Sequence, residues 1–387
     1  MNKIKHFEGL RGVAALVVLF SHFKLGYFSP EFGSLIQQIS CLGLPLVFKY
    51  LLINSLKLFT DGFLAVWIFW VLSSYVISIK FFRQNDNFDK ILIGYFSKRY
   101  FRLLFPVLSS ILFAYLLLKL GFMYNIELAN LLNADHQGLL ATCYMFAPSF
   151  WNAIKMGVFD TFLTYNGDVS YNPVLWTIQK EFLGSLFTFS IFGIVRHNKG
   201  RFSIYLVILL ITIKLKLVWL SAFVIGHVLC DFDYSSFHYG FFQKLKNVES
   251  IIHRYHIVIL ISSVVIILLG KSFMSFIKLP SEYHNFIMSV FIVYICSRNN
   301  YYRNFFSRKI PYWLGNISFS LYLIHFPILC SFTSYVLVAN LTIQGKFIAT
   351  ISTLIIVLFL SELFTKYIDK NGIIYANKIA HYFMKRN

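Results

Sequence analysis

The chain has 387 residues, of which 58% are hydrophobic, 19% are aromatic and only 13% carry a charge. Soluble proteins average about 25% charged residues; together with a mean hydropathy of +0.66, this excludes a soluble globular protein and indicates an integral membrane protein. The net charge of +19 does not indicate a nucleic-acid partner, because the basic residues lie in short loops between apolar runs rather than on one soluble face.

Apolar runs of roughly 20 residues, the length that crosses a bilayer, recur along the chain. They fall near residues 7–25, 60–79, 103–123, 173–195, 256–274, 284–297, 313–335 and 346–366. A further run over 202–230 is interrupted by Lys214 and Lys216, and it fits either one long span or two short ones. Two spans place most of the 35 Lys and Arg residues on the cytoplasmic side, as the positive-inside rule requires. The sequence therefore predicts an all-α, polytopic bundle of about ten transmembrane helices with both termini cytoplasmic.

We expect one transmembrane domain over residues 1–370 and a short cytoplasmic tail over 371–387. No cleavage site follows the first apolar run, so that run is predicted to stay as an uncleaved signal anchor. Loops over 26–59 and 124–172 are expected on the non-cytoplasmic side, and part of the second, which contains the apolar string GLLATCYMFA, is expected to re-enter or lie on the membrane. The five cysteines show no metal-ligand spacing, and no metal is predicted.

The first predicted span carries two ionisable residues, Arg11 and His22, separated by ten mostly apolar residues. Eleven helical steps end about 20° from the starting azimuth and about 16 Å further along, so both side chains share one face. Ionisable groups inside a membrane are costly and indicate a functional path. Arg11 is expected to bind an anion near one headgroup layer, and His22 to handle a proton near mid-bilayer. For either residue alone, a lipid-facing arginine or a helix-packing histidine is the alternative interpretation.

The string SKRYFRLLFP places Arg99 and Arg102 three residues apart at the cytoplasmic mouth of the third predicted span. Side chains at that spacing adjoin on one helix face, and two guanidinium groups form a phosphate-binding pair. The alternative is an ordinary positive-inside flank.

Glu181 lies eight residues beyond Pro173 in YNPVLWTIQKEFLGSLF, about 12 Å into the membrane if Pro173 opens the helix. A buried carboxylate there suits a general acid or base, or a histidine partner, although an ion pair with the adjacent Lys180 is the alternative. Trp176 suits the membrane interface. In LGNISFSLYLIHFPIL, the residues Ser318, Tyr322 and His325 follow i, i+4, i+7 spacing and form a polar stripe that either packs helices or binds substrate.

Four segments, taken in order, resemble the acyltransferase 3 family of polytopic membrane proteins: FEGLRGVAALVVLFSH, the Arg99 and Arg102 pair, PVLWTIQKEF and LGNISFSLYLIH. The resemblance implies transfer of acyl groups, most often acetyl, to extracytoplasmic glycans or other hydroxyl acceptors. It also implies a multi-pass protein of the bacterial inner membrane whose partners are membrane lipids and the acceptor. Where the family's second span usually reads Gly-Val-Asp-Leu-Phe-Phe, this chain has Ala65 to Trp70, so the acidic position is replaced. The family's closing Ile-Glu-Lys-Pro is Ile368-Asp369-Lys370-Asn371 here.

Together these observations suggest a route for cytoplasmic acyl-CoA, and the resemblance implies acetyl-CoA as the expected donor. Arg11, Arg99 and Arg102 are expected to bind the donor; His22, Glu181 and His325 to be catalytic; and Trp176, Ser318 and Tyr322 to bind substrate. His22 would act as a general base on an acceptor hydroxyl, or carry the acyl group itself. The sequence leaves these two chemistries open. A transporter or flippase with a polar intramembrane path is the competing function class.

Overall fold

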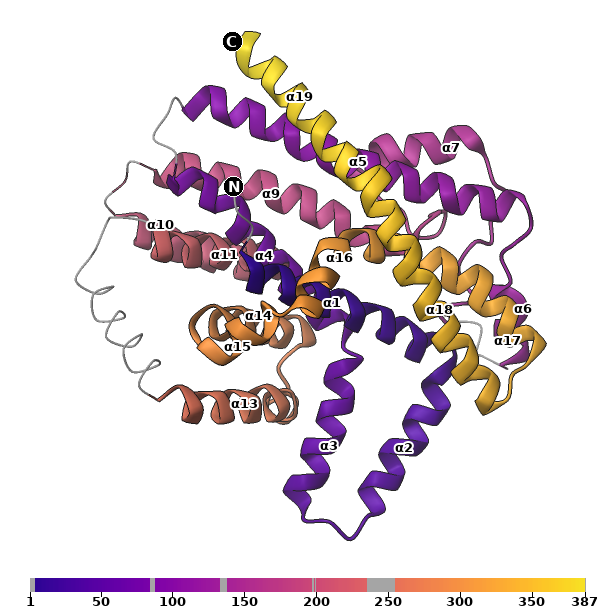
Figure 1. Ribbon diagram of the computed structural model, residues 1–387. Helices are drawn as coiled ribbons and strands as arrows, with labels where there is room; N and C mark the ends of the chain where they lie inside the picture. The colour runs from indigo at the N-terminus through magenta and orange to yellow at the C-terminus, as the bar shows by residue number, and fades with distance from the viewer. Residues whose placement is uncertain are drawn as a thin grey trace. The chain divides into compact units, whose positions relative to one another are not determined.

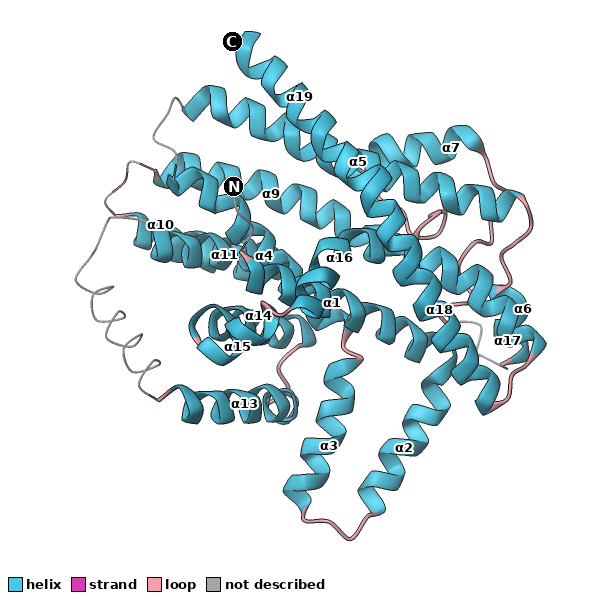
Figure 2. Cartoon of the chain, viewed as in Figure 1, coloured by secondary structure: helices cyan, strands magenta, loops and turns pink. Residues whose placement is uncertain are grey.

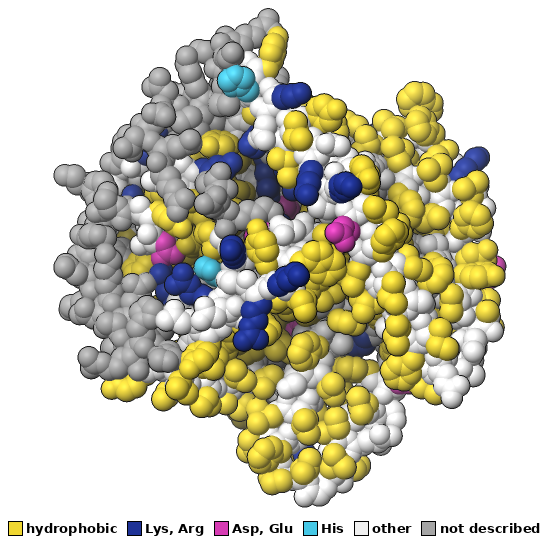
Figure 3. Space-filling view, viewed as in Figure 1, with side chains coloured by type: hydrophobic (Ala, Val, Ile, Leu, Met, Phe, Trp, Pro, Cys, Tyr) yellow, Lys and Arg dark blue, Asp and Glu magenta, His cyan; other side chains and the backbone are white. Residues whose placement is uncertain are grey.

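A computed structural model describes residues 4–83, 88–132, 138–196, 198, 200–234 and 255–386. Within those ranges every regular element is helical and no strand occurs (Figure 2). Hydrophobic side chains cover much of the face drawn in Figure 3, as contact with lipid requires. The predicted all-α membrane bundle is confirmed.

Six helical stretches among the described residues are long and apolar enough to cross a bilayer, judged by length and composition. They are Lys5–Cys41, Gly62–Phe82, Gly94–Lys119, Pro173–Val195, Lys309–Ala339 and Ile343–Tyr382. The ambiguous run over 202–230 forms two helices, α10 (Arg201–Lys214) and α11 (Val218–Tyr234), and the chain turns between them at Lys216, whose φ is 57°. The predicted total of ten spans and the cytoplasmic position of both termini stay predictions.

The chain divides into two compact units, and each is described by itself. Unit 1 comprises Met1–Val17, Ile39–Phe88 and Leu183–Asn316; unit 2 comprises Val18–Gln38, Asp89–Phe182 and Ile317–Asn387. The boundary falls inside five helices, four of which contribute several residues to each unit: α1 (Lys5–Phe23), α2 (Ser29–Cys41), α9 (Trp176–Val195) and α16 (Lys309–Ile328). The fifth, α5 (Phe88–Lys119), has only its first residue in unit 1.

Unit 1 is built around α4, which packs against α11 and α14 (Figure 1). Its remaining helices complete a bundle with an apolar core that includes Ile191, Val195 and Val224. At Gly226 of α11 a Cβ atom would lie 2.3 Å from the carbonyl oxygen of Val71, so glycine permits the close approach of α11 to α4. Besides α10 and α11, the helices wholly or almost wholly in this unit are α3 (Leu46–Phe59), α4 (Gly62–Arg83), α13 (His256–Phe276), α14 (Ser281–Arg298) and α15 (Asn300–Phe306).

Unit 2 contains long helices, labelled in Figure 1, that are interrupted by short π-helical turns, here named η. Its longer helices are α5 (Phe88–Lys119), α18 (Ile343–Phe364) and α19 (Lys370–Arg386); its shorter ones are α6 (Asn125–Leu131), α7 (Phe150–Lys155), α8 (Thr161–Leu163) and α17 (Ser334–Ala339). Four π-helical turns are η1 (Lys24–Phe28), η2 (Met156–Asp160), η4 (Leu329–Thr333) and η5 (Thr365–Asp369), and η3 (Pro173–Leu175) is a 3₁₀ turn.

The two segments expected as outer loops are partly helical. Residues 26–59 form η1, α2 and α3, because apolar strings such as LVFKYLLINSLKLF have the length and composition of helices. Residues 124–172 hold α6, α7 and α8, with buried side chains that include Leu140 and Tyr144. Whether any part of them enters the membrane stays a prediction. The predicted tail over 371–387 is helical to Arg386 as part of α19, and its cytoplasmic position also stays a prediction.

Two glycines allow the close packing of α1, the first helix of the chain. In unit 1, a Cβ atom on Gly9 would lie 1.9 Å from the carbonyl oxygen of Phe306, and one on Gly12 would lie 2.4 Å from the nitrogen of Gly315. Real Cβ atoms do not come so close to backbone, so the string FEGLRG lets α1 touch α15 and α16 at backbone distance.

Candidate active site

Two of the sequence-predicted residues, His22 and His325, meet inside unit 2. Nε2 of His325 lies 2.9 Å from Nδ1 of His22, and the two ring centroids are 5.0 Å apart. His22 is near the end of α1, and His325 is near the end of α16. The apolar sequence of each helix buries the face that carries the histidine. Residues 303 positions apart in the chain therefore form one histidine pair.

The hydrogen bonds define which nitrogen of each ring carries the proton. Nδ1 of His325 lies 3.0 Å from the carbonyl oxygen of Leu321, one turn back on the same helix. A carbonyl only accepts, so Nδ1 of His325 donates, and in a neutral ring Nε2 must then accept. His22 therefore donates from Nδ1 to His325, and the lone pair of its Nε2 is left for chemistry. These assignments follow from the hydrogen-bond network rather than from hydrogen positions.

The two histidines differ in access. His325 has no exposed surface, whereas His22 is only partly buried. The ring of Phe326 stands edge-on to His22, with centroids 5.3 Å apart. His22 is thus the less buried member of the pair.

Each histidine is followed by a π-helical turn. η1 begins two residues after His22, and η4 begins four residues after His325. π-helical turns inside α-helices are rare and occur frequently at functional sites. Both turns widen the helix next to the histidine pair.

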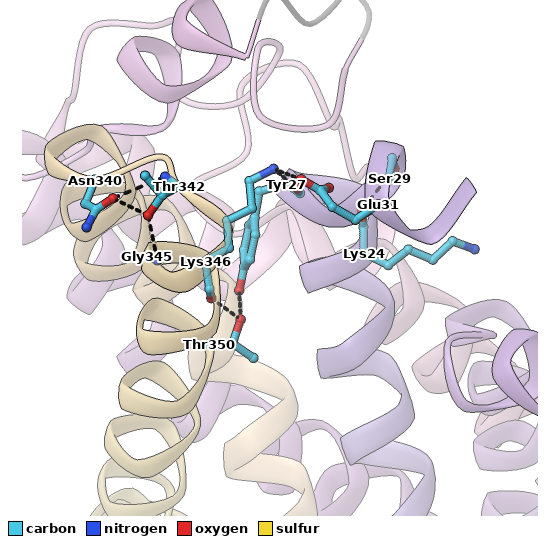
Figure 4. A network of polar contacts seen from close by, with 9 residues as sticks. All are labelled: Lys24, Tyr27, Ser29, Glu31, Asn340, Thr342, Gly345, Lys346 and Thr350. Atoms are coloured by element: carbon cyan, nitrogen blue, oxygen red, sulfur yellow. Dashed lines mark hydrogen bonds and ion pairs between the residues drawn. The ribbon is translucent and has the colours of Figure 1, made fainter. Parts of the chain in front are cut away.

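The turn after His22 is fixed by a buried lysine. Lys346, 4% exposed at the start of α18, donates from Nζ to the carbonyl oxygen of Tyr27 at 2.8 Å and to Oε1 of Glu31 at 2.5 Å (Figure 4). The hydroxyl of Tyr27 also meets Oγ1 of Thr350 at 3.0 Å. An ammonium group bound to a backbone carbonyl and a carboxylate stabilises η1 against α18.

A hydrogen bond connects α16, the helix that carries His325, to the residue before η3, the turn that leads into α9. Pro327 has no N–H group, so it cannot bond the carbonyl of Leu323 four residues earlier. Nδ2 of Asn172 donates to that carbonyl at 2.7 Å. Asn172 directly precedes η3 and has no exposed surface. The backbone two residues before His325 is therefore held by the start of the helix that carries Glu181.

Arg99 and Arg102 of α5 each face a different carboxylate. Arg99 donates from its guanidinium to Glu181 on α9, and the side chains of both are 18% exposed. Arg102 donates to both oxygens of Asp369 in η5, one bond being 3.2 Å long, and its guanidinium carbon lies 5.5 Å from the ring centroid of Phe319. Each arginine of the predicted phosphate-binding pair is thus already bound to a carboxylate. A phosphate would have to compete with that carboxylate.

The remaining sequence-predicted residues take other positions. The hydroxyl of Tyr322 lies 2.7 Å from Oγ1 of Thr177 and donates to the carbonyl of Val174 at 3.0 Å, which ties α16 to the start of α9. Trp176 lies under Nζ of Lys180, 4.9 Å from its ring centroid. Ser318 is 2% exposed. Arg11, in unit 1, has a 33% exposed side chain and a 3.5 Å ion pair with Glu8.

The sequence profile of the acyltransferase 3 family, described as an acyltransferase domain, matches residues 4–365. The chain belongs to the acyltransferase 3 family. No curated protein and no solved structure matches it. Membership makes this chain a membrane acyltransferase, and its several apolar helices make it a multi-pass integral membrane protein.

Sequence reasoning missed Asp369, although a signal for it existed. The acyltransferase 3 family closes with an acidic residue where this chain has Asp369, in Ile368-Asp369-Lys370. The structure makes that residue the partner of Arg102, 267 positions away in the chain. The string shows the negative charge of Asp369, but no local pattern links that residue to Arg102.

The acidic position that this acyltransferase lacks in its second span is occupied by Trp67. Its ring packs against Trp70, with centroids 5.1 Å apart, and against Phe286 at 6.1 Å. Asp61, which opens the same span, caps α4: Leu64 N donates to Oδ1 of Asp61 at 3.1 Å. Among the residues that the structure describes, no group of three His, Cys, Asp or Glu side chains lies together as metal ligands.

Proposed function

We propose that this acyltransferase moves an acyl group, acetyl being the first choice, from cytoplasmic acyl-CoA to a hydroxyl of an extracytoplasmic acceptor such as a surface polysaccharide or lipopolysaccharide. The observation that carries the proposal is the histidine pair. A buried His325 that accepts from Nδ1–H of a reachable His22 leaves Nε2 of His22 as a base inside a membrane acyltransferase.

In this proposal His22 acts as the general base. Its Nε2 takes the proton of the acceptor hydroxyl while that oxygen attacks the thioester carbonyl, and the proton then passes to the sulfur as the carbon–sulfur bond breaks. The products are an ester and free CoA. The positive charge on His22 is stabilised by the hydrogen bond from its Nδ1 to His325, which becomes charge-assisted at that moment.

Arg99 and Arg102 are proposed to bind the phosphates of the donor. Both guanidinium groups are partly exposed, at 18% and 25% of their side chains, so an anion can approach them. Arginine forks match phosphate oxygens. The carboxylates of Glu181 and Asp369 hold the forks in place when no donor is bound, and Glu181 is thereby proposed to couple the donor site to α9. A donor role for Arg11 stays a prediction.

The test is consumption of radiolabelled acetyl-CoA by the purified protein in lipid nanodiscs. Envelope glycans extracted from cells that lack the protein serve as the acceptor. The proposal expects free CoA and labelled, alkali-labile ester in equal amounts. No CoA release from acetyl-CoA, propionyl-CoA or succinyl-CoA contradicts a CoA-thioester donor. A labelled histidine adduct on the protein, trapped without acceptor, shows instead that His22 carries the acyl group.

A further inference from the structure

Tyr144 stands out in the segment that joins α6 to α7 because its backbone is strained. Its φ is 63°, in the left-handed region that bulky side chains rarely adopt. Its side chain is 4% exposed. A buried aromatic residue in such a conformation persists only where the surrounding structure enforces it, and such residues gather at functional sites.

A buried asparagine holds the backbone beside Tyr144. Nδ2 of Asn125, which has no exposed surface, donates to the carbonyls of Leu140 at 2.7 Å and of Cys143 at 3.0 Å. The second of these carbonyls directly precedes Tyr144. The strained conformation is therefore fixed by hydrogen bonds from α6 rather than by Tyr144 itself.

The same segment lies against the turns that follow the two histidines. Tyr124 N donates to the carbonyl of Cys330 in η4 at 2.9 Å. A Cβ atom on Gly26 of η1 would lie 3.7 Å from a methyl of Leu140 and 3.8 Å from one of Leu329. Leu140, four residues before Tyr144, thus borders η1, and the residue that precedes α6 is bonded to η4; these turns begin just past His22 and His325.

The hydroxyl of Tyr144 is buried, and it has no hydrogen-bond partner among the described residues. Neighbouring tyrosines do not share this property. The hydroxyl of Tyr165 donates to the carbonyl of Pro173 at 2.9 Å, and that of Tyr171 bonds both the N–H and the carbonyl of Ser149. Buried polar groups are nearly always paired, and one that is not requires an explanation.

Burial, reinforced by the nearby side chains of Cys330, Cys143 and Tyr165, raises the pKa of the Tyr144 hydroxyl well above its usual value. The group therefore stays protonated throughout the physiological pH range and is available as a donor. A donor that is pre-positioned, unpaired and shielded from water suits an oxygen atom brought in by a substrate.

We infer that Tyr144 binds the acyl acceptor, with its hydroxyl donating a hydrogen bond to an oxygen of that molecule. This inference rests on the proposed function and names a residue for its acceptor side. Cys330 lies five residues beyond His325, roughly one and a half helical turns towards the end of α16 that is predicted to face outwards. Because the segment of Tyr144 packs next to η1, its hydroxyl is assigned to the outer side of the histidine pair, from which the acceptor is proposed to come.

The experiment compares Tyr144→Phe with Tyr171→Phe, each of which removes only one hydroxyl. Tyr144→Phe is expected to keep or raise the melting temperature, because it removes an unpaired group, and to raise the KM for envelope glycans about tenfold. The KM for acetyl-CoA should stay unchanged. Tyr171→Phe should lower the melting temperature and leave the KM for the glycans unchanged.

Three results overturn the assignment. A melting temperature that falls in Tyr144→Phe as it does in Tyr171→Phe would show that the hydroxyl has an internal partner. An unchanged KM and kcat for glycans would remove Tyr144 from the acceptor path, and a changed KM for acetyl-CoA alone would place it on the donor side. If the unaltered protein releases no CoA from any thioester, the proposed function fails first, and the acceptor role falls with it.

Discussion

Each unit contains a fully buried histidine whose Nδ1 is hydrogen-bonded, and only one of the two leads to an accessible group. In unit 1, Nδ1 of His227 lies 2.7 Å from Oγ of Ser78, which itself donates to the carbonyl of Ser74. His227 must then donate from Nδ1, and its Nε2 has no partner among the described residues. In unit 2, Nε2 of His325 meets His22 instead.

The surroundings of the free nitrogen explain the difference. The ring of His227 is surrounded by Phe82, Tyr205 and Phe192, with centroids 5.2, 5.6 and 6.2 Å away. The hydrogen-bond chain of unit 1 therefore ends among aromatic rings, whereas that of unit 2 ends at His22, a residue that is only partly buried. A buried histidine becomes chemically useful when its hydrogen bonds connect it to a group that a substrate can reach.

The ion pairs of the two units show the same contrast. In unit 1, Arg201 binds Asp231 and Arg298 binds Asp233, and both arginine side chains are nearly enclosed, at 9% and 12% exposure. In unit 2, Arg102 is 25% exposed. All four π-helical turns of the described residues also lie in unit 2. Stability is therefore expected to depend on the polar groups of unit 1, and catalysis on those of unit 2.

The largest expected effect is that of His22→Ala. Loss of a general base lowers kcat by about 10²–10⁴-fold, and the protein should still insert in the membrane because the residue is only partly buried. The matched change in unit 1 is His227→Phe, which should alter the melting temperature and leave kcat within about threefold. Both are measured by CoA release per folded molecule. Near-normal acylation by His22→Ala removes His22 from the mechanism.

His325→Asn is expected to lower kcat by about 10–100-fold, because the shorter side chain cannot hold Nδ1–H of His22. The KM for acetyl-CoA should not change, since His325 is fully buried behind His22. Steady-state kinetics separate the two parameters. A loss confined to KM would show that His325 shapes the binding site rather than the base.

The arginine pairs are compared by removing one partner at a time. Arg102→Ala should weaken acetyl-CoA binding, measured by calorimetry, about tenfold, because a guanidinium group proposed to bind phosphate is lost. Asp369→Asn should lower the melting temperature yet bind acetyl-CoA as well or better, because it releases the guanidinium. Asp231→Asn in unit 1 should affect only the melting temperature. Equal loss of affinity in all three variants would contradict a donor role for Arg102.

The smallest effect on activity is expected from Gly12→Ala in unit 1. The new methyl would lie 2.4 Å from backbone of Gly315, so overpacking should destabilise the protein by about 1–3 kcal/mol. Gly33→Ala is the control, because no atom lies within 4 Å of its new methyl; it should be neutral or stabilising. Thermal unfolding in detergent measures both. A lower kcat per folded molecule in Gly12→Ala would mean that unit 1 takes part in the reaction.

The fold class and part of the site could be predicted from the sequence. Apolar runs located the long helices, and helical spacing put Arg11 and His22 on α1 and His325 on α16. The pairing of His22 with His325 could not be derived, because no local pattern records a contact between residues 303 positions apart. Nor could the link from Arg102 to Asp369, since the charges around each indicate only a membrane flank.

Local backbone geometry was the other feature that could not be predicted from the sequence. The π-helical turns η1 and η4 depend on tertiary contacts such as the bond from Lys346 to the carbonyl of Tyr27, not on residue propensity. The left-handed backbone of Tyr144 has no glycine or asparagine to announce it. That conformation depends on hydrogen bonds from Asn125 to the carbonyls of Leu140 and Cys143, which no local pattern predicts.

The backbone bond of His325 has an electrostatic consequence. Nδ1 of His325 is held by the carbonyl of Leu321 and not by a carboxylate, so the assigned tautomers describe an uncharged histidine pair. A neutral pair avoids the large solvation penalty that a permanent ion would incur in hydrocarbon. During transfer, the positive imidazole and the negative oxygen of the tetrahedral intermediate would arise together and side by side. The low dielectric of the membrane then strengthens their mutual attraction, so the lipid surroundings themselves favour the transition state.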